Sequence, residues 1–328
     1  MIVVTGANGL LGSYVVRKLI EAQLPFVAMR RKSSDISALS DINDTIQWVE
    51  GDVTDPDSLT EIFSKATGVI HTAAVVSYHR QDESLIKAIN VEGTRNVVNV
   101  CLATGIKRLL HVSSVAAIGK EKDQQLIDET SKWIEGAIVS NYANSKYQAE
   151  LEVWRGQEEG LSTVIVNPSV ILAPTDWDKS SAQLFKYAWQ ERPFFTAGSF
   201  SAVDVRDVAT AIVKLYSSSI EAERFILTGE PISYQDFFTQ AAKHFGKKAP
   251  SILVNRGLIQ VAARLEAIRS FLTGSRPLIT KETAQLAGKN FTYSNAKIKK
   301  ALALDFQSIE NTIAWCCAEY RQKISLKK

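Results

Sequence analysis

The sequence predicts an α/β fold built on a doubly wound parallel sheet, and three observations support this prediction. Short apolar runs that look like buried strands alternate with helix-like segments through the N-terminal half of the 328-residue chain. The first run, Ile2–Val4, leads into a glycine-rich turn and then into a helix-like segment. After Pro168 the alternation fades, and helix-like segments separated by Gly, Pro and Ser follow. We therefore expect a smaller, mostly helical C-terminal lobe beside the sheet.

The expected elements of the N-terminal part follow one another as strand and helix. The apolar runs predict strands at Ile2–Thr5, Phe26–Met29, Ile46–Glu50, Gly68–Thr72, Arg108–Ser113 and Ser162–Asn167. The segments between them predict helices near Leu10–Ala22, Ser58–Lys65, Leu85–Thr104 and Ala143–Glu158. Because crossovers between parallel strands are right-handed, this order of elements gives a doubly wound sheet.

The rest of the chain is expected to return once to the main sheet. Ser201–Ser217 reads as a further helix, and Arg224–Leu227 reads as a further strand. The other expected helices lie near Asp178–Glu191, Tyr234–Phe245, Leu258–Leu272 and Thr280–Ala287. We therefore expect two interleaved domains, with residues 1–170 plus about 201–228 in the first and about 171–200 plus 229–328 in the second.

The composition is that of an ordinary folded protein. Hydrophobic residues make up 45% of the chain and charged residues 22%, which argues against disorder. A net charge of +3 is too small to indicate a nucleic-acid partner. No apolar stretch reaches the roughly 18 residues of a membrane span, and the first strand begins at residue 2, too early for a signal peptide. We therefore expect a cytoplasmic protein without a membrane partner.

The cysteines and histidines do not form a metal-binding pattern. Cys101, Cys316 and Cys317 lack the spacing of a metal site, and two adjacent cysteines are poorly placed for a disulfide. The four histidines are scattered along the chain. We expect no metal site and a reducing environment.

The turn after the first strand has the pattern of a phosphate-binding loop. Thr5–Gly12 reads T-G-A-N-G-L-L-G, between a strand and a helix, which is the geometry that holds a dinucleotide pyrophosphate. Gly6 permits the tight turn, Gly9 lets backbone N–H groups approach phosphate oxygens, and Gly12 lets the helix pack closely. The first domain is thus expected to be a Rossmann-type dinucleotide-binding domain, although the same turn also occurs without a ligand. The expected cofactor contacts here are Gly6, Asn8, Gly9, Leu10, Leu11 and Gly12.

A serine, a tyrosine and a lysine form the candidate catalytic group. Ser114 follows a strand-like run, and ligands of such sheets bind outside the carboxyl ends of the strands. Tyr142 and Lys146 are four residues apart, so they share one helix face. A nearby ammonium lowers the pKa of a phenol, which would let Tyr142 act as general acid or base. Ser114 would hold the same substrate oxygen, with Ser113 as the competing candidate.

The tyrosine–lysine spacing occurs three times in the chain. Tyr14 lies inside the first helix, and Tyr293 lies in the C-terminal lobe without a strand-end serine shortly before it. Only Tyr142 follows such a serine and precedes another strand. The context therefore selects Tyr142 and Lys146 as the catalytic pair. The alternative is an ordinary pair of side chains on the surface of a helix.

With the glycine turn, the serine and the Tyr/Lys pair in this order, the chain resembles the extended short-chain dehydrogenase/reductase family, the NAD-dependent epimerase/dehydratase superfamily. The further matching motifs are Gly51-Asp52-Val53, His71-Thr72-Ala73-Ala74, Asn90-Val91-Glu92-Gly93-Thr94, Asn167-Pro168-Ser169-Val170 and Val203-Asp204-Val205-Arg206-Asp207-Val208. Ile279–Ala284 and Tyr293–Lys297 look like the dihydroflavonol-reductase-like branch.

The resemblance implies roles for these residues. Lys146 would hold the nicotinamide ribose as well as tune Tyr142. Asp52 and Val53 would flank the adenine. The implied lining of the cofactor channel and of the carboxamide site consists of Thr72, Ala73, Ala74, Pro168 and Val170. The family implies a backbone-placing role for His71, and for Asn90 a helix-stabilising role is favoured over a proton relay. It also implies a homodimer.

The residues after the second strand favour NADP as the cofactor, with NAD as the alternative. Arg30, Arg31 and Lys32 follow that strand, and no carboxylate appears before Asp35. Guanidinium and ammonium groups suit the 2′-phosphate of NADP, whereas a carboxylate would suit the ribose of NAD. Arg30 is the first choice, and an ordinary solvated charge run is the alternative reading.

The motifs indicate an NADPH-dependent reductase of a carbonyl group, or an alcohol dehydrogenase in the reverse direction. A nucleotide-sugar epimerase that uses the same three residues is the alternative, and a non-catalytic dinucleotide sensor is a third reading. The apolar run Val115–Ile118 stands where the family's dehydratases carry Asp-Glu, which disfavours dehydration and suggests a small, apolar substrate. The residues that could border the pocket are Tyr78, His79, Trp133, Trp177, Trp189, Phe194 and Phe195.

Overall fold

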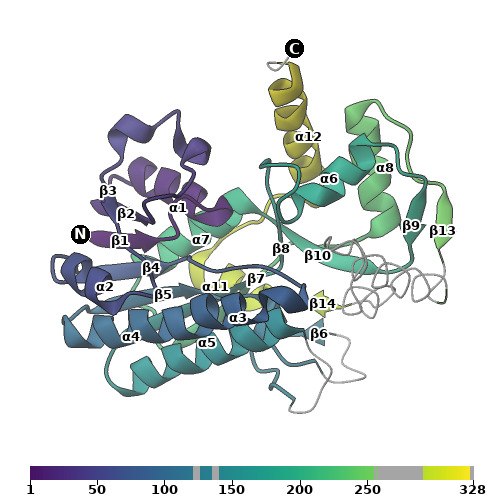
Figure 1. The fold of residues 1–328 in the computed structure, drawn as a ribbon. Helices are drawn as coiled ribbons and strands as arrows, with labels where there is room; N and C mark the ends of the chain where they lie inside the picture. Colours follow the sequence, from purple (N-terminus) through teal and green to yellow (C-terminus); the bar gives the residue numbers. More distant parts are fainter. Residues whose placement is uncertain (121–125, 135–139, 255–256, 258–290, 326–328) are drawn as a thin grey trace.

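A seven-stranded parallel sheet forms the centre of the molecule and confirms the predicted fold class (Figure 1). The computed structural model describes residues 1–120, 126–134, 140–254, 257 and 291–325. The strand order is β11-β7-β5-β4-β1-β2-β3, so the chain winds outward in both directions from the centre of the sheet. The strands are β1 (Ile2–Thr5), β2 (Phe26–Arg30), β3 (Trp48–Glu50), β4 (Gly68–His71), β5 (Arg108–Val112), β7 (Ser162–Pro168) and β11 (Glu223–Leu227).

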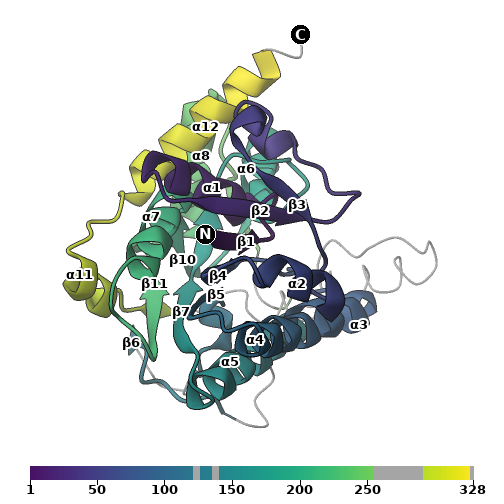
Figure 2. The same ribbon diagram turned by 90° about the vertical axis from the view of Figure 1, so that its left-hand side faces the viewer.

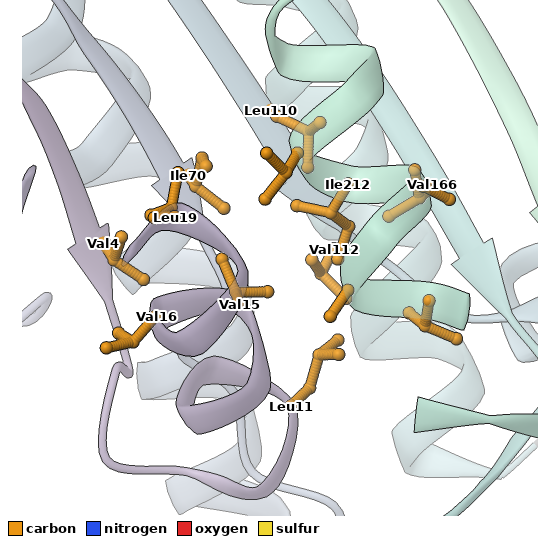
Figure 3. Packing of buried hydrophobic residues seen from close by; sticks show 14 of the residues in the cluster. Val4, Leu11, Val15, Val16, Leu19, Ile70, Leu110, Val112, Val166 and Ile212 are labelled. Atoms are coloured by element: carbon orange, nitrogen blue, oxygen red, sulfur yellow. The ribbon is translucent and has the colours of Figure 1, made fainter. Parts of the chain in front are cut away.

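Helices cover both faces of this sheet (Figure 2). The helices on the two faces are α1 (Leu10–Glu21) and α7 (Val205–Tyr216) on one side, and α2 (Pro56–Phe63), α4 (Gly93–Ala103) and α5 (Asn141–Glu158) on the other. Successive strand residues alternate between the two cores. Val4 and Leu110 pack under α1 and α7, while Val3 and Leu109 pack under α2 and α4. Figure 3 shows the first core, where Leu11, Val15 and Leu19 of α1 approach the strands beside α7.

The second part of the chain builds a lobe around its own apolar core. The helices of this core are α6 (Ala182–Trp189), α8 (Tyr234–Phe245) and α12 (Ile309–Ser325). The small strands that accompany them are β8 (Val170–Leu172), β10 (Ser199–Asp204) and β12 (Pro231–Ser233) in one sheet, β9 (Phe194–Thr196) with β13 (Ile252–Val254), and β6 (Leu126–Ile127) with β14 (Thr292–Tyr293). Helix α11 (Ala296–Leu302) packs beside β11. No described helix has the length and apolar character of a membrane span.

The remaining short elements lie in the connections. They are the 3₁₀ turns η1 (Ser37–Leu39), η2 (Asn43–Thr45), η3 (Arg80–Asp82) and η5 (Val115–Ala117), the short helix α3 (Glu83–Ile86) and the π-helical segment η4 (Lys87–Glu92). The predicted helix Leu85–Thr104 is therefore found as a continuous helical run, in which the π-helical segment η4 joins α3 to α4.

Most expected elements are found, and the differences have local causes. The expected helix Ser201–Ser217 begins only at Val205, because the preceding residues pair with β8 and Asp204 caps the helix through the backbone N–H of Arg206. The expected strand Arg224–Leu227 is present as β11 and pairs with β7 in the main sheet. The interleaved domain division itself stays a prediction. The expected helices Leu258–Leu272 and Thr280–Ala287 lie outside the described residues.

Candidate active site

The candidate serine and tyrosine meet at the carboxyl edge of the sheet. Strand β5 ends at Val112, and Ser114 then caps the turn η5 by accepting a hydrogen bond from the Ala116 N–H at 3.1 Å. Helix α5 begins beside it, capped by Ser140, so Tyr142 lies in its first turn. The Tyr142 side chain adjoins Ser114, whose hydroxyl lowers the pKa of the phenol. The structure thus brings two of the three candidate side chains together at one point.

Tyr142 is held as a neutral phenol. Its side chain is 7% exposed, and burial raises its pKa, with a smaller contribution from Tyr78 in the same direction and from Ser114 in the opposite one. The sequence argument expected this pKa to be lowered, and the net shift is in the opposite direction because burial is its largest cause. A phenol in this state can donate a proton.

Lys146 lies one turn further along the same helix and is buried. Its Nζ donates a hydrogen bond to the Val112 carbonyl at 2.8 Å, at the end of β5. Burial lowers its pKa to about 8, and the Glu150 carboxylate acts in the opposite direction. The ammonium is therefore charged at neutral pH and loses its proton within the working range of many enzymes.

Ser113, the competing candidate, points elsewhere. It is 4% exposed and faces the Glu150 carboxylate instead of Tyr142. The geometry therefore favours Ser114 as the serine that can share a substrate oxygen with Tyr142.

The glycine turn is shaped by contacts that leave no room for side chains. Gly6 has φ +67°, and a Cβ there would lie 2.7 Å from Ala73 Cα. A Cβ at Gly12 would lie 2.1 Å from the Gly6 carbonyl oxygen. Gly9 precedes α1 without any side-chain cap, and no acidic residue stands in the first turn. The N-terminus of this 12-residue helix thus offers backbone N–H groups for an anion, which fits a dinucleotide pyrophosphate.

Arg30 ends β2, and Arg31 and Lys32 follow it in a loop that contacts the glycine turn through the Asn8 amide and the Asp35 carbonyl. The Arg30 guanidinium lies 5.6 Å from the centre of the Trp48 ring, and its Nη1 donates to the Lys32 carbonyl at 3.4 Å. Arg31 and Lys32 are exposed. Asp35 accepts hydrogen bonds from the backbone and side chain of Ser37, both at 2.9 Å. The first carboxylate after the strand is therefore engaged in a local turn.

Other predicted cofactor residues line the same edge. Asp52 accepts two hydrogen bonds from Thr54, and Val53 packs under Gly93, where a Cβ would lie 2.8 Å from Val53 Cγ2. Thr72 donates to the Thr5 carbonyl at 2.7 Å, which ties the end of β4 to the glycine turn. The remaining predicted residues are Ala73 and Ala74 after β4, Pro168 at the end of β7 and Val170 at the start of β8.

His71 and Asn90 hold the backbone of this edge in place. His71 bridges the hydroxyls of Thr5 and Thr94, at 2.7 and 3.1 Å. Asn90 receives a hydrogen bond from the Val75 N–H and donates to the Val75 carbonyl and to Ser145. Every polar atom of the Asn90 side chain is thereby engaged, which is the geometry of a positioning residue.

Tyrosines from distant segments border the reactive hydroxyls. The Tyr78 ring meets Tyr142 edge-on, with ring centres 5.7 Å apart. Tyr234 and Tyr293 lie close enough to Tyr78 to interact with it electrostatically. The sequence analysis singled out Tyr78 but missed Tyr234, and it set Tyr293 aside because no serine precedes it.

The other aromatic candidates belong to packing contacts. Trp177 stacks on Tyr320 and Trp189 packs against Phe245, both in the core of the lobe. Trp133 stacks on Tyr147 of α5, at 4.3 Å between ring centres. Phe195 packs at the edge of the lobe core, and Phe194 is 48% exposed.

Comparison with known proteins agrees with this geometry. Residues 2–226 match the model of the NAD dependent epimerase/dehydratase family. A putative dihydroflavonol 4-reductase from Synechocystis is 30% identical over 319 residues, which cover 95% of this chain and 92% of that protein. Cinnamoyl-CoA reductase 1 of Petunia hybrida is 26% identical over 261 residues, 75% of this chain and 77% of that one.

Solved structures share the whole fold. The crystal structure of gox2253 has a TM-score of 0.85 and 30% identity, with 98% of each chain covered. A UDP-glucose 4-epimerase from Thermotoga maritima, solved with UDP-glucose, has a TM-score of 0.79 at 19% identity, covering 98% of this chain and 99% of that one. At 19% identity, the similarity to this epimerase shows a common fold.

Proposed function

Because the chain belongs to the NAD-dependent epimerase/dehydratase family, within the extended short-chain dehydrogenases/reductases, we propose that it is an NADPH-dependent carbonyl reductase. One observation carries the proposal: Ser114 lies beside Tyr142 and acts on its phenol, with the Lys146 ammonium one helix turn away. Two hydroxyls and a buried cation at one point can hold and protonate a carbonyl oxygen.

Ser114, Tyr142 and Lys146 have separate roles in the proposed reduction. Ser114 donates a hydrogen bond to the substrate oxygen and orients it, and Tyr142 gives that oxygen its proton. Lys146 stabilises the phenolate that this transfer leaves behind, because an opposite charge favours the ionised form. NADPH supplies the hydride when it is bound. The glycine turn would hold its pyrophosphate and Lys146 its nicotinamide ribose.

The preference for NADPH rests on Arg30. Its guanidinium lies at the end of β2 against the Trp48 ring. The loop that follows adjoins the glycine turn, where the Asn8 amide donates to the Asp35 carbonyl at 3.1 Å. A guanidinium in that place suits a phosphate dianion, and Arg31 and Lys32 add charge. The described loop presents no free carboxylate before Asp35, so nothing there favours the unphosphorylated ribose of NAD.

The surroundings of Tyr142 support a small, largely apolar substrate. Tyr78 packs against it, and Val170, 38% exposed, stands at the start of β8. The turn after Ser114 is Val115–Ala117, which offers no acid for dehydration. The proposal therefore favours reduction over the sugar chemistry of some relatives.

We also propose a homodimer that works in the cytoplasm, on the family resemblance alone. Light scattering tests the first part. A mass of twice 36.2 kDa supports the dimer, and a single-chain mass rejects it.

The test of the proposed function combines binding and turnover. Protein fluorescence is titrated with NADPH, NADH and UDP-glucose, and a panel of aldehydes and ketones is assayed with NADPH. We expect NADPH to bind at least about tenfold tighter than NADH, and Tyr142→Phe to lower kcat by about 10²–10⁴-fold with unchanged NADPH affinity. Tyr14→Phe is the matched control, because Tyr14 is the tyrosine of another Y-x-x-x-K pair of the chain and lies away from the site.

Three results would count against the proposal. Tight binding of UDP-glucose together with NADH would indicate an epimerase. NADPH binding without turnover of any carbonyl compound, unaffected by Tyr142→Phe, would indicate a dinucleotide sensor. Equal losses in Tyr14→Phe and Tyr142→Phe would remove Tyr142 from the chemistry.

A further inference from the structure

The helix that carries Tyr142 and Lys146 bears a third ionisable side chain, Glu150. It follows Lys146 by four residues, so both lie on the same face of α5. Glu150 is only 1% exposed. A carboxylate in the interior costs free energy unless charged or hydrogen-bonding partners compensate for the lost water. Its surroundings therefore show what it interacts with.

We propose that Glu150 is a positioning residue that keeps the Lys146 ammonium charged and, through Asn167, fixes the segment that presents Ser114. This inference rests on the proposed function only for the roles of Lys146 and Ser114. The contacts of Glu150 are independent of the reaction.

The first contact runs to the serine segment. The Asn167 Nδ2 donates to Glu150 Oε1 at 2.5 Å and to the Ser114 carbonyl at 2.9 Å. Asn167 lies near the end of β7 and is fully buried. One amide group therefore joins the carboxylate on α5 to the backbone of Ser114, and the carboxylate orients that amide.

The second contact is with Arg224, whose positive charge opposes the rise in the pKa of the Glu150 carboxyl that burial causes. The Arg224 Nη1, from β11, lies 3.4 Å from Glu150 Oε2. The same guanidinium donates to the carbonyl oxygens of Glu129 and Ser131, at 2.6 to 3.0 Å. Arg224 is thus anchored independently of Glu150. Replacing Glu150 by glutamine would leave the guanidinium with partners, so the variant isolates the loss of one negative charge.

The third interaction is with Lys146. The groups that act on the lysine are few. Burial keeps the imidazoles of His71 and His111 neutral, with pKa values far below their usual range, and Tyr142 is a neutral phenol. Among the described residues, Glu150 is the acidic group whose charge acts on Lys146, with the Arg224 cation behind it. Without that charge, the Val112 carbonyl would be the one hydrogen-bond acceptor of the ammonium in the described part of the chain.

The test measures the pH titration of Lys146 directly, in the full-length protein without cofactor. Lysine labelled with ¹³C at Cε is followed by NMR as the pH is raised, and the Lys146 signal is identified by its loss in Lys146→Met. The wild-type midpoint is expected near pH 8. We expect Glu150→Gln to lower it by about one pH unit or more. Glu152→Gln, on the same helix but in an ion-pair network with Arg95 and Arg155, removes the same charge and is expected to leave the midpoint in place.

A second measurement needs no substitution at Glu150. In the wild-type protein the ¹³Cδ signal of Glu150, observed with labelled glutamate, is expected to shift with the same midpoint as Lys146. An unchanged Lys146 midpoint in Glu150→Gln, or a flat Glu150 signal across the lysine titration, would overturn the inference. Both readouts hold whether or not the protein reduces carbonyls.

Turnover then connects this inference to the proposed function. If Lys146 must be charged, kcat for carbonyl reduction falls as the pH rises through the lysine midpoint, and this fall moves to lower pH in Glu150→Gln. A midpoint that moves without any reductase activity in the wild type would reject the proposed function and leave the role of Glu150 standing.

Discussion

The main sheet and the C-terminal lobe are built on different principles. In the sheet, the backbone itself shapes the glycine turn, because main-chain atoms leave no room for a Cβ at Gly6 or Gly12 and helix α1 begins there without a side-chain cap. In the lobe, interlocking aromatic rings such as Phe185, Phe237 and Tyr320 fill a core. A core of this kind tolerates exchange among apolar side chains, whereas a backbone contact tolerates no added atom. We therefore expect single substitutions in the glycine turn of the sheet to reduce stability and binding more than substitutions among apolar residues in the lobe core.

The largest effect is expected from Gly12→Ala. Its Cβ would lie 2.1 Å from the Gly6 carbonyl oxygen and 2.9 Å from Ala7 Cα, which are backbone atoms, so a side-chain rotation cannot relieve the clash. We expect a loss of about 3 kcal/mol in the free energy of unfolding and no measurable NADPH binding. Denaturant unfolding and fluorescence titration check this. Gly105→Ala serves as control, since a Cβ there meets nothing within 4 Å, although its φ of +72° carries a strain of its own. Equal binding by Gly12→Ala and the wild type would contradict the comparison.

The second effect is a loss of folding stability at low pH. His71 is fully buried, and burial lowers its pKa to about 3, whereas an unfolded histidine has a pKa of about 6.5. The folded-state pKa is depressed, so the unfolded chain binds the extra proton and stability is lost as the pH falls from about 6.5 towards 3. His71 alone accounts for about 2 kcal/mol at pH 5.

Amide hydrogen exchange at several pH values measures where this loss falls. We expect the amides of β4, which carries His71, and of the neighbouring β1 to lose protection before those of α8 in the lobe. His71→Asn is expected to reduce the slope of the unfolding free energy against pH between pH 6.5 and 4, and His111, whose pKa burial also lowers, contributes to the slope that remains. The same slope in that variant would exclude His71 as the cause.

How far the sequence predicts this molecule depends on the range of the interactions. The glycine turn, the strands and the Tyr142/Lys146 pair are local patterns, so they could be identified without a structure. The direction of the Tyr142 pKa could not, because it depends on burial by segments such as the one that carries Tyr78. Glu150 was also missed. Only its spacing from Lys146 hinted at it, since glutamate on a helix is ordinarily a surface residue.

In the lobe, Phe237→Leu is expected to have a smaller effect. Phe237 is fully buried and packs against Phe185 and Phe200. Neighbouring rings can move to fill part of the lost volume, so we expect about 1 kcal/mol of destabilisation and unchanged NADPH affinity. Thermal unfolding and the same fluorescence titration give both values. A loss of cofactor binding would show that the lobe core shapes the cofactor site, against the division drawn above.

The smallest effect tests whether packing also serves the site within the sheet. The Trp48 ring supports the Arg30 guanidinium at 5.6 Å, and such a contact stabilises by about 0.5–1 kcal/mol at exposed sites. Trp48→Leu is therefore expected to weaken NADPH binding by about two- to fivefold and to leave NADH binding unchanged, because only the 2′-phosphate would feel Arg30. Trp48 also donates to Asn43 Oδ1 at 2.9 Å, so Asn43→Ala separates the loss of that hydrogen bond from the loss of the ring. A matching change in NADH affinity would mean that Trp48 shapes the adenosine site as a whole, and Arg30 would then lose its support as the residue that selects the cofactor.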